Sequence, residues 1–194
     1  LIVKFGLKRL NEKRNQGLSI LFDTLDLSRV VCSDIAYKIA PRINAAGRMG
    51  DAYRAFELLT LTDVGRLKQI VDEIERDNAD RKRMCDEMFD EAVGDLASED
   101  LVRNRAIVLS HPSWEKGITG ILAARLTGEY NRPAFIMVKS GDDVYKGTCR
   151  SIDGINVHEL LVACKDYLVE FGGHAQAAGV NLKEENFAAL ENAL

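Results

Sequence analysis

The sequence predicts an α/β fold, in which a mixed sheet covered by helices follows a long connector helix and a short helical segment. Three patterns support this prediction. Strand-like runs alternate with helical stretches after residue 96, a long amphipathic stripe fills residues 51–95, and two short apolar faces precede residue 50. With 194 residues, 46% hydrophobic and 29% charged, the chain can bury a sizeable core and is not of a disordered, collagenous or disulfide-stapled class.

The first 50 residues are predicted to form short helices and loops. Two apolar faces are joined by the polar stretch 11–17, and the small residues of PRINAAGR, at 41–48, predict a loop. This segment holds too little apolar material to stand alone. Because the chain also begins with Leu rather than Met, we expect it to be a piece of a longer protein, in which these helices pack on further structure.

The middle of the chain is predicted to hold two helices. Asp51 can cap the first, and Thr62–Asp63 can cap a much longer one whose apolar residues recur at three- and four-residue steps. Between residues 74 and 84 this stripe turns polar, with Asn78 and Arg81 three residues apart on one face. A long helix with a polar waist indicates a connector between two domains, and the alternative is a helix whose middle is simply exposed to solvent.

The last section is predicted to be a compact α/β domain, because β-branched runs flanked by Gly or Pro alternate with helical stretches. The expected strands are 105–110, 134–139, 144–150 and 178–182, and the expected helices are 117–129, 156–169 and 184–194. Asn156 is expected to cap the second of these helices.

The charge of the chain is unevenly distributed. With 26 Lys and Arg against 30 Asp and Glu, the net charge of −4 argues against a strongly basic nucleic-acid binder. Lys and Arg nevertheless dominate residues 1–50 and 101–150, whereas Asp and Glu dominate residues 51–100 and 151–194. The two basic segments could face a common anionic ligand, and ordinary solvated surface is the alternative.

Several features of other protein classes are missing from the sequence. No run approaches the roughly 18 apolar residues of a membrane span, and the N-terminus lacks the pattern of a signal peptide, so we expect no membrane association and a cytoplasmic location. The four cysteines and three histidines lack metal-ligand spacing, so no metal site is expected in this chain. The motifs of serine esterases, P-loop NTPases and dinucleotide-binding proteins are also missing.

Two adjacent glycines followed by a histidine form the sharpest candidate for a binding site. In FGGHAQAAG, Gly172 and Gly173 allow backbone N–H groups to approach an anion without an intervening Cβ. His174 can add a donor directed at a phosphate. The alternative is a tight Gly–Gly turn that leads into the strand 178–182 and carries a surface histidine.

A second candidate lies in KGTCRS, at the end of a predicted strand. Alternation places Thr148 and Arg150 on one face, where the guanidinium offers two donors to a phosphodiester, and Ser151 adds a hydroxyl. The alternative is a basic edge strand that leads into a turn.

Two weaker candidates complete the set. Arg42, Asn44 and Arg48 crowd charge and an amide among small residues, as the close approach of a polyanion requires. Trp114 opens a loop onto a helix N-terminus, where it could stack a base, although a tryptophan in this setting is more often part of the core.

These motifs occur in a recognisable order. PRINAAGR, the Asn78-x-x-Arg81 helix, WxxGIxGI, KGTCRS and FGGHxxAAG together resemble the RecJ-type single-strand-specific 5′-to-3′ DNA exonucleases of the DHH phosphoesterase superfamily. The resemblance covers essentially the whole chain. It implies that residues 1–50 are the C-terminal end of a DHH domain, residues 51–95 a helical connector and residues 96–194 a DHHA1 domain.

The resemblance also implies roles for individual residues. Arg150, Ser151, Gly172, Gly173 and His174 would hold nucleic-acid phosphates, with further contacts from Trp114, Asn78 and Arg81, whereas Arg42, Asn44 and Arg48 would face the cleft beside the metal site.

Catalysis in this family uses two Mn²⁺ or Mg²⁺ ions held by Asp and His residues that include an Asp-His-His triplet, which this chain lacks. We therefore expect a monomeric fragment that binds single-stranded DNA and does not hydrolyse it alone. Two alternatives remain: a DHH/DHHA1 phosphodiesterase that acts on short oligonucleotides or cyclic dinucleotides, and a non-catalytic nucleic-acid-binding scaffold module.

Overall fold

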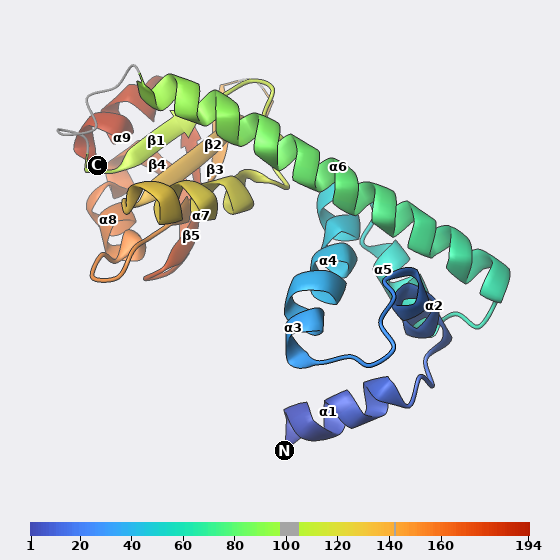
Figure 1. The fold of residues 1–194 in the computed structure, drawn as a ribbon. Coiled ribbons are helices and arrows are strands. Elements are labelled where there is room, and N and C mark those ends of the chain that lie inside the picture. Colours follow the sequence, from blue (N-terminus) through green and yellow to red (C-terminus); the bar gives the residue numbers. More distant parts are fainter. Residues whose placement is uncertain (98–104, 142) are drawn as a thin grey trace. The chain divides into compact units, whose positions relative to one another are not determined.

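The computed structural model describes residues 1–97, 105–141 and 143–194. Its residues form two compact units, Leu1–Arg83 and Met84–Leu194, and each has its own arrangement of elements (Figure 1). Helix α6 (Val64–Ala97) supplies its first part to one unit and its last part to the other. The chain contains both helices and a mixed sheet in addition to this long helix, so the predicted α/β class is confirmed. None of the helices among the described residues combines the length and apolarity needed to cross a membrane.

The N-terminal unit is entirely helical. Before α6 it contains α1 (Ile2–Asn11), α2 (Gln16–Thr24), α3 (Cys32–Asp34), a π-helical turn (Ile35–Ile39), α4 (Ala40–Met49) and α5 (Tyr53–Thr60). Leu21, Phe22, Leu58, Leu67 and Ile70 are fully or almost fully buried, so α2, α5 and α6 share one apolar core. Helix α1 contributes no buried side chain to it.

The prediction of a loop at residues 41–48 is wrong, because this stretch lies within α4. Pro41 occupies the first turn of the helix, where its missing N–H costs no intrahelical hydrogen bond. Ala45 and Ala46 are completely buried, so the small residues that suggested a loop instead let the helix pack closely on its neighbours. The small residues do mark a site of close approach, but the approaching groups belong to the protein itself.

Both carboxylates that were expected to cap the helices of the middle section accept a backbone hydrogen bond at a helix start, but the N-cap residue of α5 is Ala52 rather than Asp51. The Asp51 Oδ1 atom accepts a hydrogen bond from the Tyr53 backbone N–H at 2.8 Å, and the Asp63 Oδ1 atom accepts one from the Arg66 N–H at 2.6 Å. Each carboxylate thereby satisfies an N–H group at a helix start that has no intrahelical partner.

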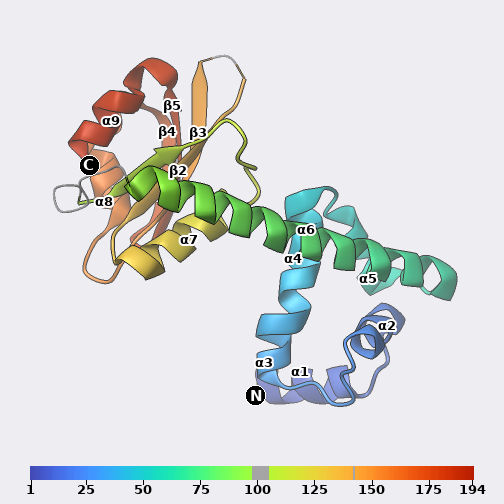
Figure 2. The same cartoon turned by 45° about the horizontal axis from the view of Figure 1, so that its top comes forward.

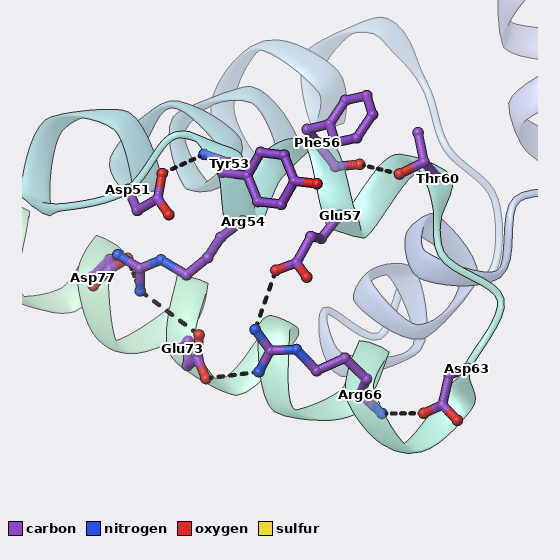
Figure 3. A network of polar contacts seen from close by, with 10 residues as sticks. All are labelled: Asp51, Tyr53, Arg54, Phe56, Glu57, Thr60, Asp63, Arg66, Glu73 and Asp77. Carbon is purple, nitrogen blue, oxygen red and sulfur yellow. Dashed lines mark hydrogen bonds and ion pairs between the residues drawn. The ribbon is translucent and has the colours of Figure 1, made fainter.

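Two arginines join α5 to α6 through ion pairs with three carboxylates (Figure 3). The Arg66 guanidinium lies 3.1 Å from Glu57 and 3.4 Å from Glu73, and that of Arg54 lies 2.9 Å from Asp77 and 3.9 Å from Glu73. The Asp77 Oδ2 atom is buried and has no hydrogen bond of good geometry among the described residues, despite its short distance to Arg54. Its negative charge is therefore incompletely compensated.

This environment gives Asp77 a distinct pH dependence. Burial raises the pKa of Asp77 above its ordinary value, Arg54 opposes the rise, and the neighbouring Asp80 and Glu73 carboxylates add to it. A carboxyl group whose pKa is higher in the folded state favours folding while it is protonated, and this contribution is lost as the pH rises through the folded-state pKa.

We therefore expect Asp77→Asn to gain stability relative to the unchanged chain as the pH rises from about 4 to about 7. Urea unfolding followed by circular dichroism at both pH values measures this difference. Asp72→Asn, on the exposed side of the same helix, is the matched control and should show little change. A larger stability loss for Asp77→Asn at the higher pH would mean that the Arg54 ion pair outweighs the burial of the carboxylate.

The C-terminal unit contains a five-stranded mixed sheet of order β1-β2-β3-β5-β4. The strands are β1 (Ile107–Ser110), β2 (Ala134–Lys139), β3 (Val144–Arg150), β4 (Leu168–His174) and β5 (Ala177–Lys183). Only the β1–β2 pair is parallel. The helices are α7 (Thr119–Tyr130), α8 (Val157–Ala163) and α9 (Phe187–Ala193), with short 3₁₀ turns at Lys165–Tyr167 and Glu184–Asn186.

The sequence prediction missed β4. The helix expected over 156–169 ends at Ala163, and the chain enters a strand that includes both glycines of the GGH motif. The alternative of a tight Gly–Gly turn is also wrong, since the hairpin reverses at Ala175 and Gln176, after His174 pairs with Ala177. Asn156 caps α8 as expected, with its Oδ1 atom accepting from the N–H groups of residues 158 and 159.

The two faces of the sheet have different neighbours (Figure 2). One face packs on α8 and α9 through the buried side chains of Phe135, Met137, Cys149, Val180 and Leu182. Helix α7 packs on the opposite face, over β2 and β3. This second face also presents the alternate residues of β3, β5 and β4, and it carries the motifs that the sequence singled out.

Candidate nucleic-acid interface

Three rows of residues cross β3, β5 and β4 on the α7 side of the sheet. Strand alternation places every second residue on this face, and the register sets which residues lie beside one another. The rows are Arg150–Ala177–His174, Thr148–Gly179–Gly172 and Lys146–Asn181–Glu170. The register therefore brings the KGTCRS and GGH motifs together, with Arg150 and His174 at the two ends of one row.

A groove of about 330 Å³ lies over the second and third rows. We call it the glycine groove, and its lining residues are Lys116, Thr119, Lys146, Gly147, Thr148, Glu170, Phe171, Gly172, Gly179, Val180 and Asn181. A Cβ at Gly172 would meet no heavy atom within 4 Å, and one at Gly179 would meet only a carbonyl oxygen at 3.9 Å. The floor is thus bare backbone, because the two residues at its centre have no side chains.

Gly173 has a different function from its neighbour. A Cβ at this position would lie 2.3 Å from the Ala177 carbonyl oxygen and 2.5 Å from the Ala178 Cα. Its φ of +154° is also uncommon for residues with side chains. Gly173 is therefore required for the close pairing of β4 with β5, whereas Gly172 keeps the groove open.

The Arg150 side chain is positioned by the start of α7. A Cβ on Gly120 would lie 3.1 Å from Arg150 Nη2 and 3.3 Å from Thr148 Cγ2, so a larger residue there would crowd the guanidinium. Arg150 Nη1 donates to the Cys149 carbonyl at 2.9 Å. No carboxylate in the described part of the chain forms an ion pair with Arg150. Its remaining N–H groups can serve an external anion.

His174 and Ser151 lie at the same end of the sheet. The exposed His174 ring accepts the Gln176 backbone N–H at its Nδ1 atom at 3.3 Å, so the neutral ring carries its proton on Nε2 as a donor. Ser151 donates its hydroxyl proton to the Ile155 carbonyl at 2.7 Å, which fixes the loop after β3. Its hydroxyl can therefore accept further hydrogen bonds, but it has no second proton to give a phosphate.

The thiol of Cys149 lies on the opposite face, within the core. Burial raises the pKa of Cys149 to about 12, even though the adjacent Arg150 acts in the other direction. The thiol stays protonated at neutral pH and is a packing group, so Cys149 takes no part in binding an anion at the second motif.

Trp114 is not available as a stacking surface. Its side chain is only 5% exposed, and its Nε1 atom donates to Glu91 of α6 at 2.8 Å. The Glu91 carboxylate also accepts from Ser113 at 3.4 Å, so the loop before α7 is tied to the long helix. The core alternative for this tryptophan is the one that the structure supports.

The remaining candidates lie in the N-terminal unit. The Arg42 guanidinium pairs with Glu75 and donates to the Lys38 carbonyl at 2.8 Å, which makes it a brace between helices. Asn44 and Arg48 are exposed, four residues apart on one side of α4. The structure thus separates Arg42 from the other two members of its motif.

The two polar residues at the middle of α6 are partners of each other. Asn78 is only 3% exposed, and its Oδ1 atom accepts from Arg81 Nη2 at 3.1 Å. The simple alternative of a solvent-exposed helix middle therefore fails at Asn78. The Arg81 Nε atom is buried without a hydrogen-bond partner in the described ranges.

The residues described do not provide the donor set of a divalent metal centre. Within residues 1–97, 105–141 and 143–194, no three side chains of His, Cys, Asp or Glu gather closely enough to hold a metal ion. The chemistry that the site itself offers is the recognition of anions by cationic side chains, beside a floor that has no side chains.

The C-terminal unit matches a known domain family. Residues 103–194 match the DHHA1 domain, so the resemblance expected from the sequence is confirmed for this part of the chain. The chain as a whole is homologous to a segment of the RecJ exonucleases. It is 34% identical over 197 residues to the single-stranded-DNA-specific exonuclease RecJ of Bacillus subtilis and 32% identical over 198 residues to that of Escherichia coli.

Solved structures agree with this assignment. The crystal structure of RecJ with Mg²⁺ from Thermus thermophilus is 33% identical and matches with a TM-score of 0.88 over 99% of this chain and 30% of that one. A structure of exonuclease RecJ bound to manganese gives 0.84 at 34% identity, over 99% of this chain and 47% of that one. The present chain covers 25% of the B. subtilis protein and 34% of the E. coli protein.

Sequence reasoning missed the third row and the Lys116 side of the groove. Lys146 and Lys116 lie inside the motifs, but the sequence alone does not single them out, because their relation to Glu170 and Asn181 depends on the β4–β5 pairing. The available signal was the alternation Lys146, Thr148, Arg150, which places all three on one face once β3 is correctly assigned.

Proposed function

We propose that this chain is the substrate-holding part of a single-strand-specific DNA exonuclease, in which the Arg150–His174 row binds phosphates of the strand. The observation that carries this proposal is the row itself, where a guanidinium and an imidazole lie on either side of Ala177, next to the glycine floor of the groove. Phosphate contacts of this kind position a strand without reading its bases. The homologous proteins bear the name of single-stranded-DNA-specific exonucleases, which agrees with this assignment.

The metal-dependent step belongs to residues outside these 194. The homologous structures contain Mg²⁺ or Mn²⁺, and the side chains described here do not form a site for either ion. In the intact protein the divalent metal would supply Lewis-acid chemistry at the scissile phosphate. This chain binds and orients the strand through its own hydrogen-bond donors, and it does so as a monomer. Residues 1–50 form the end of the DHH domain, and residues 51–95 form the connector.

We expect the 194-residue chain to bind single-stranded DNA weakly and not to hydrolyse it in the presence of Mn²⁺ or Mg²⁺. Fluorescence anisotropy with a labelled oligothymidylate measures binding, and gel analysis of the same oligonucleotide measures hydrolysis. Affinity should fall as salt rises, since phosphate contacts release counterions. Robust metal-dependent hydrolysis by this chain would refute the claim that the catalytic groups lie elsewhere.

Two other functions can be separated by the same measurements. A phosphodiesterase acting on short oligonucleotides or cyclic dinucleotides would bind those ligands better than a longer strand. A non-catalytic scaffold would bind DNA equally well, but the full-length protein would not cleave it. Arg150 and His174 lie in one row and can bind neighbouring phosphates of a continuous strand. This arrangement favours the exonuclease among the three functions.

A further inference from the structure

The two lysines of the glycine groove lie at the opposite end from Arg150. Lys146 is in the third row, four residues before Arg150 on β3, and Lys116 lines the same groove from the loop that precedes α7. No carboxylate within the described ranges forms an ion pair with either ammonium group. The groove therefore has cationic groups beyond those of the Arg150–His174 row.

The Lys116 backbone is held in place over β3. The Thr119 hydroxyl donates to the Lys116 carbonyl at 2.9 Å and lies 3.2 Å from the Thr148 hydroxyl. Because Thr119 gives its only proton to that carbonyl, Thr148 must be the donor between the two hydroxyls. Thr119 is only 1% exposed, so this link between α7 and β3 is a fixed part of the groove wall.

A single acidic side chain faces the two lysines from the third row. Asn181 donates to the Glu170 carboxylate at 3.0 Å across β5 and β4, and this hydrogen bond holds the carboxylate on the far side of the groove from β3. An anion beside the lysines would thus experience attraction from β3 and α7 and repulsion from β4. The affinity for an anion at this end of the groove should therefore fall when the lysines are removed and rise when the Glu170 charge is removed.

The distance between the two cationic ends fits a short length of single strand. Four residues along an antiparallel strand span about 14 Å, at roughly 3.4 Å per residue. A stacked nucleic-acid strand also rises about 3.4 Å per nucleotide, so the ends are roughly four stacked nucleotides apart, and fewer if the strand is extended. The bare glycine floor between them leaves space for the intervening sugars.

We propose that Lys116 and Lys146 form a second phosphate-binding position, so that the strand crosses the glycine groove from the Arg150–His174 row towards these lysines. This inference rests on the proposed function, and it adds a direction and a minimum length to the bound strand. A dinucleotide, with one internucleotide phosphate, is too short to occupy both positions, whereas an octanucleotide can.

The test compares Lys116→Ala/Lys146→Ala with the unchanged chain by fluorescence anisotropy at several salt concentrations. We expect the double variant to bind a labelled thymidine octanucleotide about tenfold more weakly at low salt. The slope of log K against log salt should fall by about 0.7, as for one lost phosphate contact on a single strand. Competition by unlabelled thymidine dinucleotide should be unchanged. Lys165→Ala is the control, because Lys165 is exposed on a 3₁₀ turn outside the groove.

A variant that is expected to strengthen binding provides an independent check. Glu170→Gln keeps an acceptor for Asn181 but removes the negative charge, so the octanucleotide should bind several-fold more tightly. Unchanged affinity and salt slope in the double lysine variant, together with weaker binding by Arg150→Ala, would overturn the second position and leave the proposed function standing. If the unchanged chain fails to bind the octanucleotide, the proposed function itself fails.

Discussion

Gly173→Ala is expected to destabilise the C-terminal unit by about 3 kcal/mol or more, because the new Cβ would overlap the β5 backbone. The nearest atoms are the Ala177 oxygen at 2.3 Å and the Ala178 Cα at 2.5 Å, and both are backbone atoms held by the β4–β5 pairing. No side-chain rotation can relieve the overlap, so the hairpin itself must open. Thermal unfolding followed by circular dichroism measures the loss.

The neighbouring glycine provides the matched control. A Cβ at Gly172 would meet no atom within 4 Å, so Gly172→Ala should change the free energy of unfolding by less than about 1 kcal/mol. The same methyl group would protrude from the groove floor, so this variant should fold normally and bind single-stranded DNA more weakly. Equal stability losses in the two variants would contradict the separate roles assigned to these glycines.

Arg150→Ala is expected to lower affinity for single-stranded DNA by roughly 10- to 100-fold, since a hydrogen bond to a charged group contributes about 1.5–3 kcal/mol. His174→Ala should have a smaller effect in the same direction, because the neutral imidazole offers one donor and the guanidinium offers several. Anisotropy titrations at two or more salt concentrations distinguish a lost phosphate contact, which reduces the salt slope, from a general loss of folded protein.

Because Arg150 also packs beside Gly120 of α7, a second variant is needed to separate binding from folding. Arg150→Lys keeps the positive charge and most of the side chain but loses the two-pronged donor geometry, so it should retain stability and recover part of the affinity. Lys165→Ala is again the control. Unchanged affinity in both Arg150→Ala and His174→Ala would argue against the assigned surface.

The strands that the sequence predicted best are those with a dense β-branched pattern and clear boundaries. The expected ranges 134–139 and 144–150 coincide with β2 and β3, because each is flanked by turn-forming residues. Strand β4 was missed, since its two glycines have low strand propensity and its start continues the apolar pattern of α8. Its pairing with β5 compensates for both, which only the folded chain reveals.

The residues of the candidate site likewise fall into those that the sequence could predict and those that only the fold brings together. Arg150 and His174 were found from their own motifs, because a cation beside glycines has a chemical meaning even without a fold. That they share a row, and that Lys146 and Lys116 lie at the other end of the groove, depends on the strand register. Arg42 and Trp114 are residue types that can bind nucleic acid, but both have partners within the protein. Arg42 forms an ion pair with Glu75, and Trp114 donates a hydrogen bond to Glu91.

The glycine floor has a thermodynamic consequence for any strand that binds there. Ordering flexible side chains at an interface costs roughly 0.5–1.5 kcal/mol for each one immobilised. Gly172 and Gly179 have no rotatable side-chain bonds, and the backbone around them is already fixed by hydrogen bonds across three strands. Association at the centre of the groove therefore freezes almost no protein motion, and the entropy loss on the protein side is confined to the long cationic side chains at its ends.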